Sequence, residues 1–217
     1  MTKLARYWLA IVFVLASFAV AIYFHPRLPA RVPVHWSSHG TVDGWMPRGP
    51  GAFTLPIVST VLLALMILLE PATVREEGHR SLGAVYPFLV ATTSAFLLYA
   101  TLIVLLAGIG MPLDVPAALT VGIGILFMVM GNSAPKLTRN SFVGIRSPWT
   151  LANEEVWWRT HRLAGWLLVL SGGVTVILGF LGYGGLVALT AVLVACAVCY
   201  LYSYIVWRRV RAGPQAS

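Results

Sequence analysis

The chain has 217 residues, of which 59% are hydrophobic and only 10% are charged, and it carries a formal net charge of +8 with a pI near 10.0. The charges cluster between long apolar segments, which excludes an ordinary soluble domain and indicates a polytopic membrane protein. A basic pI would suggest nucleic-acid binding in a soluble domain. Here we attribute it to membrane topology and attraction to anionic lipid, and we predict no direct nucleic-acid binding.

Six apolar runs are long enough to cross a hydrocarbon core of roughly 30 Å at a helical rise of about 1.5 Å per residue. In chain order they are residues 8–24, 53–69, 83–107, 116–130, 164–181 and 186–206, of which the fourth is the shortest. The first run could belong to a signal peptide, but it is long enough to span and we interpret it as a retained helix. We predict an all-α fold, with one six-helix membrane domain over residues 1–217.

The positions of Lys and Arg set the predicted orientation, because cytoplasmic connections retain positive charge. With the amino terminus inside, 12 of the 15 Lys and Arg residues lie inside, and only Arg27, Arg31 and Arg48 lie outside. This split predicts an even number of spans and two cytoplasmic termini. The spans hold almost no ionisable groups, with Glu70 at the very end of one, which disfavours a transporter.

The outer connection, residues 25–52, is predicted to be a compact extracytoplasmic loop with room for one short hairpin. Its five prolines forbid a long helix, and its Asp43-Gly44 pair favours a turn.

Five side chains of this loop are candidate contact residues: His35, Trp36, His39, Asp43 and Trp45. The two histidines and the aspartate are four residues apart and would gather three metal ligands on one face of a helix. Gly40 and the nearby turn disfavour that helix, so we predict no metal. We favour tryptophans at the membrane interface and histidines bonded to backbone, and keep zinc and a contact surface for an external peptide as alternatives.

The inner connection, residues 132–163, begins where the fourth span ends. Gly131-Asn132 followed by Pro135 predicts a helix stop with a left-handed cap.

The rest of the inner connection contains signals for a turn and for a new helix. Gly144 allows the backbone to turn, Ser147-Pro148 can open a helical turn, and Thr150 or Asn153 can cap the helix that leads into the fifth span.

On that helix, Glu154 and Glu155 occupy the first turn, where acidic groups offset the helix dipole. Glu155 precedes Arg159 by four residues, a stabilising ion-pair order, while Glu154, Trp157 and His161 share one face.

Three interpretations of this connection remain open. It is a structural junction, or a docking surface for a protein, or a cytoplasmic pocket in which basic groups and two asparagines bind an anion. The pocket would use Lys136, Arg139, Arg146, Arg159, His161 and Arg162 with Asn132 and Asn140. The candidate ligand- or partner-binding residues are Asn132, Lys136, Arg139, Asn140, Arg146, Trp149, Glu154, Trp157, His161 and Arg162.

Signals for an enzyme are weak. The sequence has no G-x-S-x-G, H-E-x-x-H or Walker motif, and a Glu154 and His161 pair on one helical face is common in helices without chemistry. Cys196 and Cys199 lie inside the last span, where small residues favour helix packing over metal or redox chemistry. We predict no catalytic residue and no cofactor.

The inner connection resembles the signature of the SdpI family of bacterial six-helix membrane proteins. The matching residues are Gly131-Asn132, Pro135-Lys136, Asn140, Gly144-Ile145-Arg146, Pro148-Trp149-Thr150-Leu151, Glu154, Trp157 and Thr160-His161 through Gly165. The outer segment from Leu28-Pro29 through His35, with Gly40 and Asp43-Gly44, is similar to a domain of unknown function that often precedes this signature.

The resemblance implies a function and a location. The founding family member protects a cell from its own secreted peptide toxin and, when engaged, holds a transcriptional repressor at the membrane. We therefore expect a multi-pass protein of the bacterial cytoplasmic membrane that serves toxin immunity or signal transduction, with a peptide toxin outside and a regulator protein inside as partners besides the bilayer. The alternative is a lipid or small-anion binding or transport protein that uses the cytoplasmic arginine cluster.

Overall fold

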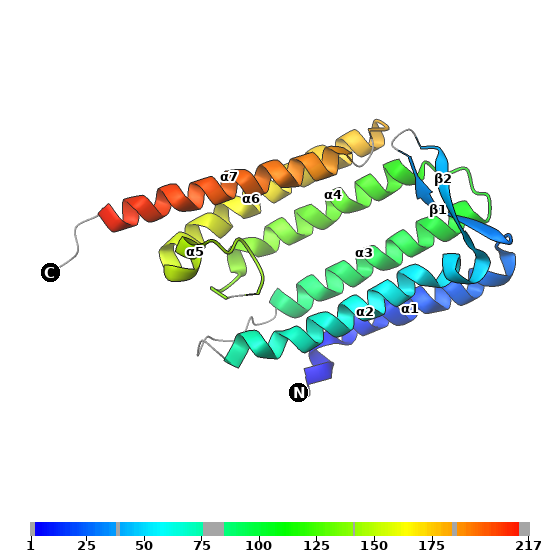
Figure 1. Ribbon diagram of the computed structural model, residues 1–217, viewed down its shortest axis with the longest axis horizontal. Helices are drawn as coiled ribbons and strands as arrows, with labels where there is room; N and C mark the ends of the chain where they lie inside the picture. The colour runs from blue at the N-terminus through cyan, green and yellow to red at the C-terminus, as the bar shows by residue number, and fades with distance from the viewer. Residues whose placement is uncertain (1–2, 38–39, 76–84, 141, 184–185, 213–217) are drawn as a thin grey trace.

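The structure is a computed structural model of the chain, and it describes all residues except 1–2, 38–39, 76–84, 141, 184–185 and 213–217. Long helices run side by side, with a β-hairpin at one end, while the polypeptide begins and ends towards the opposite end (Figure 1). The long helices are α1 (Trp8–Phe24), α2 (Arg48–Arg75), α3 (Val85–Gly108), α4 (Val115–Ser133), α6 (Glu154–Phe180) and α7 (Leu186–Ala212). Each is long and apolar enough to cross a membrane, so the predicted six-helix membrane fold is confirmed.

Short elements complete the described chain. They are the 3-10 helices η1 (Lys3–Tyr7), η2 (His25–Arg27) and η3 (Ala134–Lys136), the helix α5 (Pro148–Ala152), and the strands β1 (Arg31–Trp36) and β2 (Val42–Pro47). The hairpin follows η2, and η3 and α5 belong to the inner connection.

Several helices extend beyond the predicted spans. Helix α2 runs from Arg48 to Arg75, so it extends beyond the predicted span 53–69 at both ends and continues through Pro71. Helix α6 begins at Glu154, so the junction helix and the fifth span form one continuous helix. The predicted start of the third span, at Gly83, lies outside the described residues.

The helices form two groups. Helices α1, α2 and α3 pack against one another, α4 and α7 pack against α6, and α3 beside α4 joins the groups (Figure 1). In the first group, the buried hydroxyls of Ser17 and Thr101 are 3.1 Å apart and link α1 to α3.

Glycines allow α4 and α6 to approach closely. A Cβ on Gly124 would lie 2.7 Å from the Gly172 carbonyl oxygen, and one on Gly131 would lie 2.8 Å from the Gly165 carbonyl oxygen. Small residues at a crossing let two backbones touch, which is a common way for helices to associate in lipid. Gly131 is therefore a packing residue inside α4, and the predicted left-handed cap there is wrong, because the helix continues to Ser133 and ends at Ala134 in a right-handed conformation.

An ion pair with a buried carboxylate links η1, which leads into α1, to α2. The Arg6 guanidinium lies 3.0 Å from the Glu70 carboxylate, which is 4% exposed. Beside it, the Tyr86 hydroxyl donates to the Met66 carbonyl at 2.8 Å, and the rings of Tyr7 and Tyr86 meet edge to face at 6.3 Å. These contacts fix α1, α2 and α3 at the end that faces the inner connection.

Candidate functional site

The outer connection folds into the antiparallel hairpin β1–β2, so the predicted hairpin is confirmed. The sequence predicted a turn at Asp43-Gly44, but the two strands are joined between Ser37 and Thr41. The Ser37 N–H donates to the Thr41 carbonyl at 2.8 Å. Gly44 instead pairs with His35 across the hairpin, where a Cβ on Gly44 would lie 2.7 Å from the His35 Cβ. Close strand contact, rather than a turn, requires this glycine.

His35 and Asp43 meet at the exposed side of the hairpin. Nδ1 of His35 donates to the Asp43 carboxylate at 2.5 Å, so the expectation that this histidine bonds to backbone is wrong. His39, the third member of the predicted triplet, lies outside the described residues. Among the residues that the structure describes, no group of three His, Cys, Asp or Glu side chains could hold a metal ion.

A cavity of about 750 Å³ lies beneath the hairpin, between β1, β2 and the outer parts of α2, α3 and α4. We call it the outer cavity. Its lining is mostly apolar and includes Trp36, Met46, Phe96, Ala100 and Leu119. Trp36, a predicted contact residue, thus faces the cavity, whereas Trp45 is half exposed on the hairpin.

The inner connection is held together by side-chain bonds to its own backbone. Asn140 is 5% exposed, and its carbonyl oxygen accepts from the N–H groups of Phe142 and Val143 at 2.8 and 2.7 Å. Its amide group donates to the carbonyls of Thr138 and Val143 at 2.8 and 3.1 Å. Asn140 therefore stabilises the shape of the loop through both its amide oxygen and its amide nitrogen.

His161 joins this loop to α6. Its Nε2 accepts from the Ile145 N–H at 3.0 Å, and its Nδ1 donates to the Trp157 carbonyl at 2.9 Å, an arrangement that requires a neutral imidazole. The Trp157 ring stacks on the imidazole at 3.9 Å and donates its own N–H to the Leu137 carbonyl at 2.8 Å. Gly144, with φ of 116°, lies against the ring. Both nitrogens are engaged by backbone groups, so neither is open for the acid-base role considered from the sequence.

Local caps set the start of α5 and α6, as predicted. Ser147 caps α5 in a capping box with Thr150, and the side chain of Asn153 accepts from Val156 N–H at the start of α6. The predicted ion pair between Glu155 and Arg159 forms at 2.7 Å on the surface of α6.

Trp149 anchors α5 to the end of α7. Its indole N–H donates to the hydroxyl of Ser203, which also lies 3.2 Å from the Ser147 hydroxyl. The indole packs against three aromatic rings of α7: Tyr200, Tyr204 and Trp207. The inner connection is thus fixed both to α6 and to α7.

The predicted inner residues separate into two sets. The first set holds the loop in place and consists of Asn140, Trp149, Trp157 and His161. The second, which we call the surface set, lies at the surface and consists of Asn132, Lys136, Arg139, Arg146, Glu154 and Arg162. The surface set is exposed except for half-buried Arg139, which donates to the Leu151 carbonyl at 3.0 Å. The guanidinium of Arg162 lies 5.3 Å from the Trp158 ring centre. The predicted convergence of basic groups on a pocket with His161 is wrong, because His161 faces inward while Arg146, Arg159 and Arg162 face out.

Sequence reasoning missed the contact between the inner connection and α3. Phe142 packs edge to face against Tyr86 at 5.7 Å, and both lie in the cluster that includes Tyr7. The signal was present, since Phe142-Val143 is an apolar pair within an otherwise polar stretch.

This geometry defines a six-helix membrane protein with a β-hairpin over a cavity at one end and a self-bonded polar segment at the other. Residues 136–204 match the SdpI/YfhL protein family, and residues 12–60 match a domain of unknown function, DUF1648. The family resemblance predicted from the sequence is thereby confirmed. The chain is 28% identical over 209 residues to Immunity protein SdpI of Bacillus subtilis (strain 168), covering 94% of this chain and 97% of that protein. No solved structure matches the chain.

Proposed function

We propose that this chain is an immunity protein of the bacterial cytoplasmic membrane and protects its cell from a secreted peptide toxin. Similarity to Immunity protein SdpI extends over nearly the whole length of both chains, which supports a shared role. The orientation rests on charge, because the hairpin end carries Arg27, Arg31 and Arg48 while most other basic residues belong to the opposite end. The hairpin then faces the side from which a secreted toxin arrives.

The outer cavity is the single observation that carries the proposal. Its volume of about 750 Å³ is within the range of roughly 300–1,000 Å³ of ligand sites. Its lining is mostly apolar, and two of its hydroxyl groups bond within α2 and α4: Thr54 to the Pro50 carbonyl at 2.7 Å and Thr120 to the Pro116 carbonyl at 2.7 Å. Such a site suits apolar side chains of a peptide, with Trp36 as an aromatic anchor at its rim.

A survival assay tests the proposal. The chain is expressed in a toxin-sensitive host, which is then exposed to a purified secreted peptide toxin of the kind that a related immunity protein counters. Ala100, which is 7% exposed and lines the outer cavity, is replaced in the variant Ala100→Phe to fill that space. The matched control is Leu102→Phe on the same helix, at a side chain that is 37% exposed.

We expect wild type and Leu102→Phe to raise survival and Ala100→Phe to lose the protection, with equal amounts of the three proteins in the membrane. Protection by none of them would refute the immunity function. Full protection by Ala100→Phe would preserve that function but remove the outer cavity as its site.

We also propose that the surface set of the inner connection is a docking surface for a cytoplasmic regulator protein. The observation that supports it is the division between the two sets, because the buried side chains make the loop rigid and leave Lys136, Arg146 and Glu154 facing outward. Exposed charged side chains at an interface steer the encounter of two proteins. Copurification of a cytoplasmic protein with wild type but not with Arg146→Glu would support docking, and identical copurification with both would refute it.

A further inference from the structure

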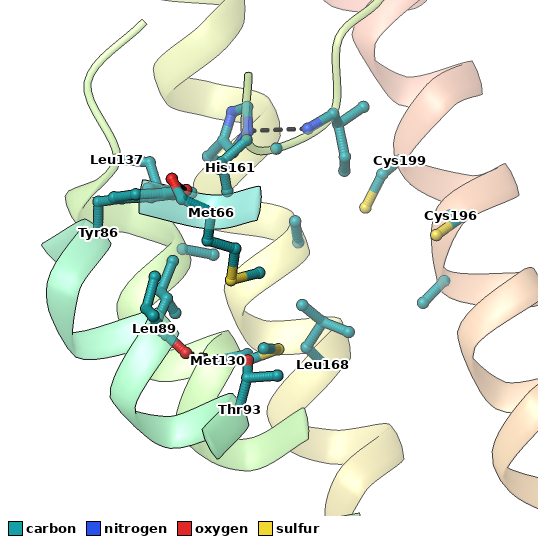
Figure 2. Close-up of a pocket in the computed structure, with 17 residues that line it drawn as sticks. Met66, Tyr86, Leu89, Thr93, Met130, Leu137, His161, Leu168, Cys196 and Cys199 are labelled. Atoms are coloured by element: carbon teal, nitrogen blue, oxygen red, sulfur yellow. Dashed lines mark hydrogen bonds between the residues drawn. The ribbon is translucent and has the colours of Figure 1, made fainter. Parts of the chain in front are cut away.

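A second cavity, of about 240 Å³, lies in the inner half of the bundle (Figure 2). We call it the inner cavity. Tyr86 and Thr93 of α3 lie on one side of it, Cys196 and Cys199 of α7 lie opposite, and Leu168 of α6 lies between them in the view of Figure 2. The inner cavity thus separates α7 from the first helix group.

The loop of the inner connection forms the roof of this cavity. Residues 143–145 line it, and the bond from the Ile145 N–H to His161 holds them in place. The site is therefore closed towards the charged end of the molecule. Cys196 is both exposed and part of the lining, so the cavity reaches the membrane-facing surface beside α7.

The polar groups around the inner cavity are already bonded within the protein. The Tyr86 hydroxyl donates to the Met66 carbonyl at 2.8 Å, and the Thr93 hydroxyl donates to the Leu89 carbonyl at 3.0 Å. Both nitrogens of His161 are engaged by backbone groups, as described above. Because these three polar side chains already have hydrogen-bond partners, the surface that remains for a ligand consists of hydrocarbon and sulfur. Such a surface favours an apolar occupant.

Size and position narrow the class of occupant. An apolar cavity of about 150 Å³ accepts benzene, so by proportion a volume of 240 Å³ holds a chain of roughly ten carbon atoms. The opening lies within the membrane-spanning part of α7, where acyl chains are the surrounding solvent. Filling the space also gains dispersion contacts that an empty cavity forfeits.

We infer that the inner cavity is a binding site for the terminal part of one acyl chain of a bilayer phospholipid, which enters beside α7 at Cys196 and lies under the roof of the inner connection. The site is distinct from the outer cavity and does not depend on the proposed immunity function. The bound chain connects the two helix groups where α7 and α3 are separated.

Photo-crosslinking tests the site directly. The full chain is reconstituted in vesicles of phosphatidylethanolamine and phosphatidylglycerol that contain a phosphatidylglycerol with a diazirine in one acyl chain, and crosslinked residues are mapped by mass spectrometry. We expect crosslinks at Thr93 and Leu168 in the cavity as well as at Leu170, whose side chain is 61% exposed to surrounding lipid.

Filling the cavity provides the decisive comparison. Ala195 lines the cavity and is 6% exposed, so Ala195→Phe should abolish the crosslinks at Thr93 and Leu168 while those at Leu170 persist. The matched control is Val194→Phe, at a neighbouring side chain that is 57% exposed, and it should change neither. Cys199→Phe is a second filling variant in case Ala195→Phe does not fold.

Three outcomes would overturn the inference. They are the absence of cavity crosslinks in wild type, their persistence in a folded filling variant, and their formation only with a diazirine fatty acid added from the aqueous phase. The last result would assign the cavity to a different ligand. Loss of toxin protection in the survival assay has no bearing on any of these measurements.

Discussion

Gly144 and His161 form the contact on which the shape of the inner connection depends. Gly144 has φ of 116°, in the region that side-chain-bearing residues rarely adopt, and a Cβ placed on it would lie 2.3 Å from the Nε2 of His161. That nitrogen is the acceptor for the Ile145 N–H. We predict that Gly144→Ala strains the backbone and displaces the imidazole from this bond.

The magnitude follows from these two effects. Holding alanine in a sparsely populated conformation costs about 1–3 kcal/mol. Leaving the Ile145 N–H without its acceptor adds about 1–3 kcal/mol. We therefore expect Gly144→Ala to lower the free energy of unfolding by roughly 2–6 kcal/mol, the sum of these two ranges. Denaturant unfolding of the protein in mild detergent, followed by tryptophan fluorescence, measures it.

Gly110 provides a matched control for the strain alone. Its φ is 90°, and a Cβ built on it meets nothing within 4 Å. Gly110→Ala should therefore cost only the conformational part, about 1–3 kcal/mol. A cost for Gly144→Ala no larger than that for Gly110→Ala would refute the contact with His161.

A double-mutant cycle isolates the pair. His161→Ala removes the same acceptor, so the combination with Gly144→Ala loses that bond only once and should be less destabilising than the sum of the single variants by about 1–3 kcal/mol. Strict additivity would show that the two residues act independently.

Three further predictions concern stability in detergent. Glu70→Gln breaks the ion pair with Arg6 and should lower the free energy of unfolding by roughly 1–3 kcal/mol, because the Glu70 carboxylate is buried while the Arg6 guanidinium is partly hydrated. Glu155→Gln breaks the exposed pair with Arg159 and should lower it by less than about 1 kcal/mol. Equal losses would contradict the burial of the first pair. Gly172→Leu should separate α4 from α6 and lower the melting temperature, while Gly173→Leu, where a Cβ meets nothing within 4 Å, should not. Trp149→Phe should cost about 1 kcal/mol from its lost N–H bond and increase proteolysis of residues 137–147; an unchanged digestion pattern would show that this anchor is dispensable.

Features set by local chemistry or by the bilayer could be predicted from the sequence. Six helices follow because backbone groups in lipid must bond within their own segment, and the apolar runs are long enough to span. The starts of α5 and α6 also follow, because Ser147-Pro148 and Asn153 cap helices through atoms only three residues away.

Features that depend on distant partners could not be predicted. Gly131 before Pro135 has the local pattern of a helix cap, but it lies within α4, and a Cβ on it would lie 2.8 Å from the Gly165 carbonyl oxygen on another helix. Similarly, Asp43-Gly44 has the pattern of a turn, but the pairing of Gly44 with His35 places it in a strand. In each case the glycine is needed because a neighbouring residue leaves no room for a side chain, and only the fold shows which neighbour that is.

His161 illustrates why the candidate site was only partly predictable. Its position among Arg159 and Arg162 suggested a cationic group for an anion, because residue type and helical face were the only guides. Burial reverses that role, since an imidazole that accepts a backbone N–H is a neutral structural group, while the neighbouring arginines remain at the surface. The two ends of the protein therefore present different chemistry. The outer end contains a mostly apolar cavity, and the inner end presents charged side chains on a loop whose shape is fixed from within. We therefore expect substitutions at the exposed arginines to alter binding of the proposed regulator without altering the fold.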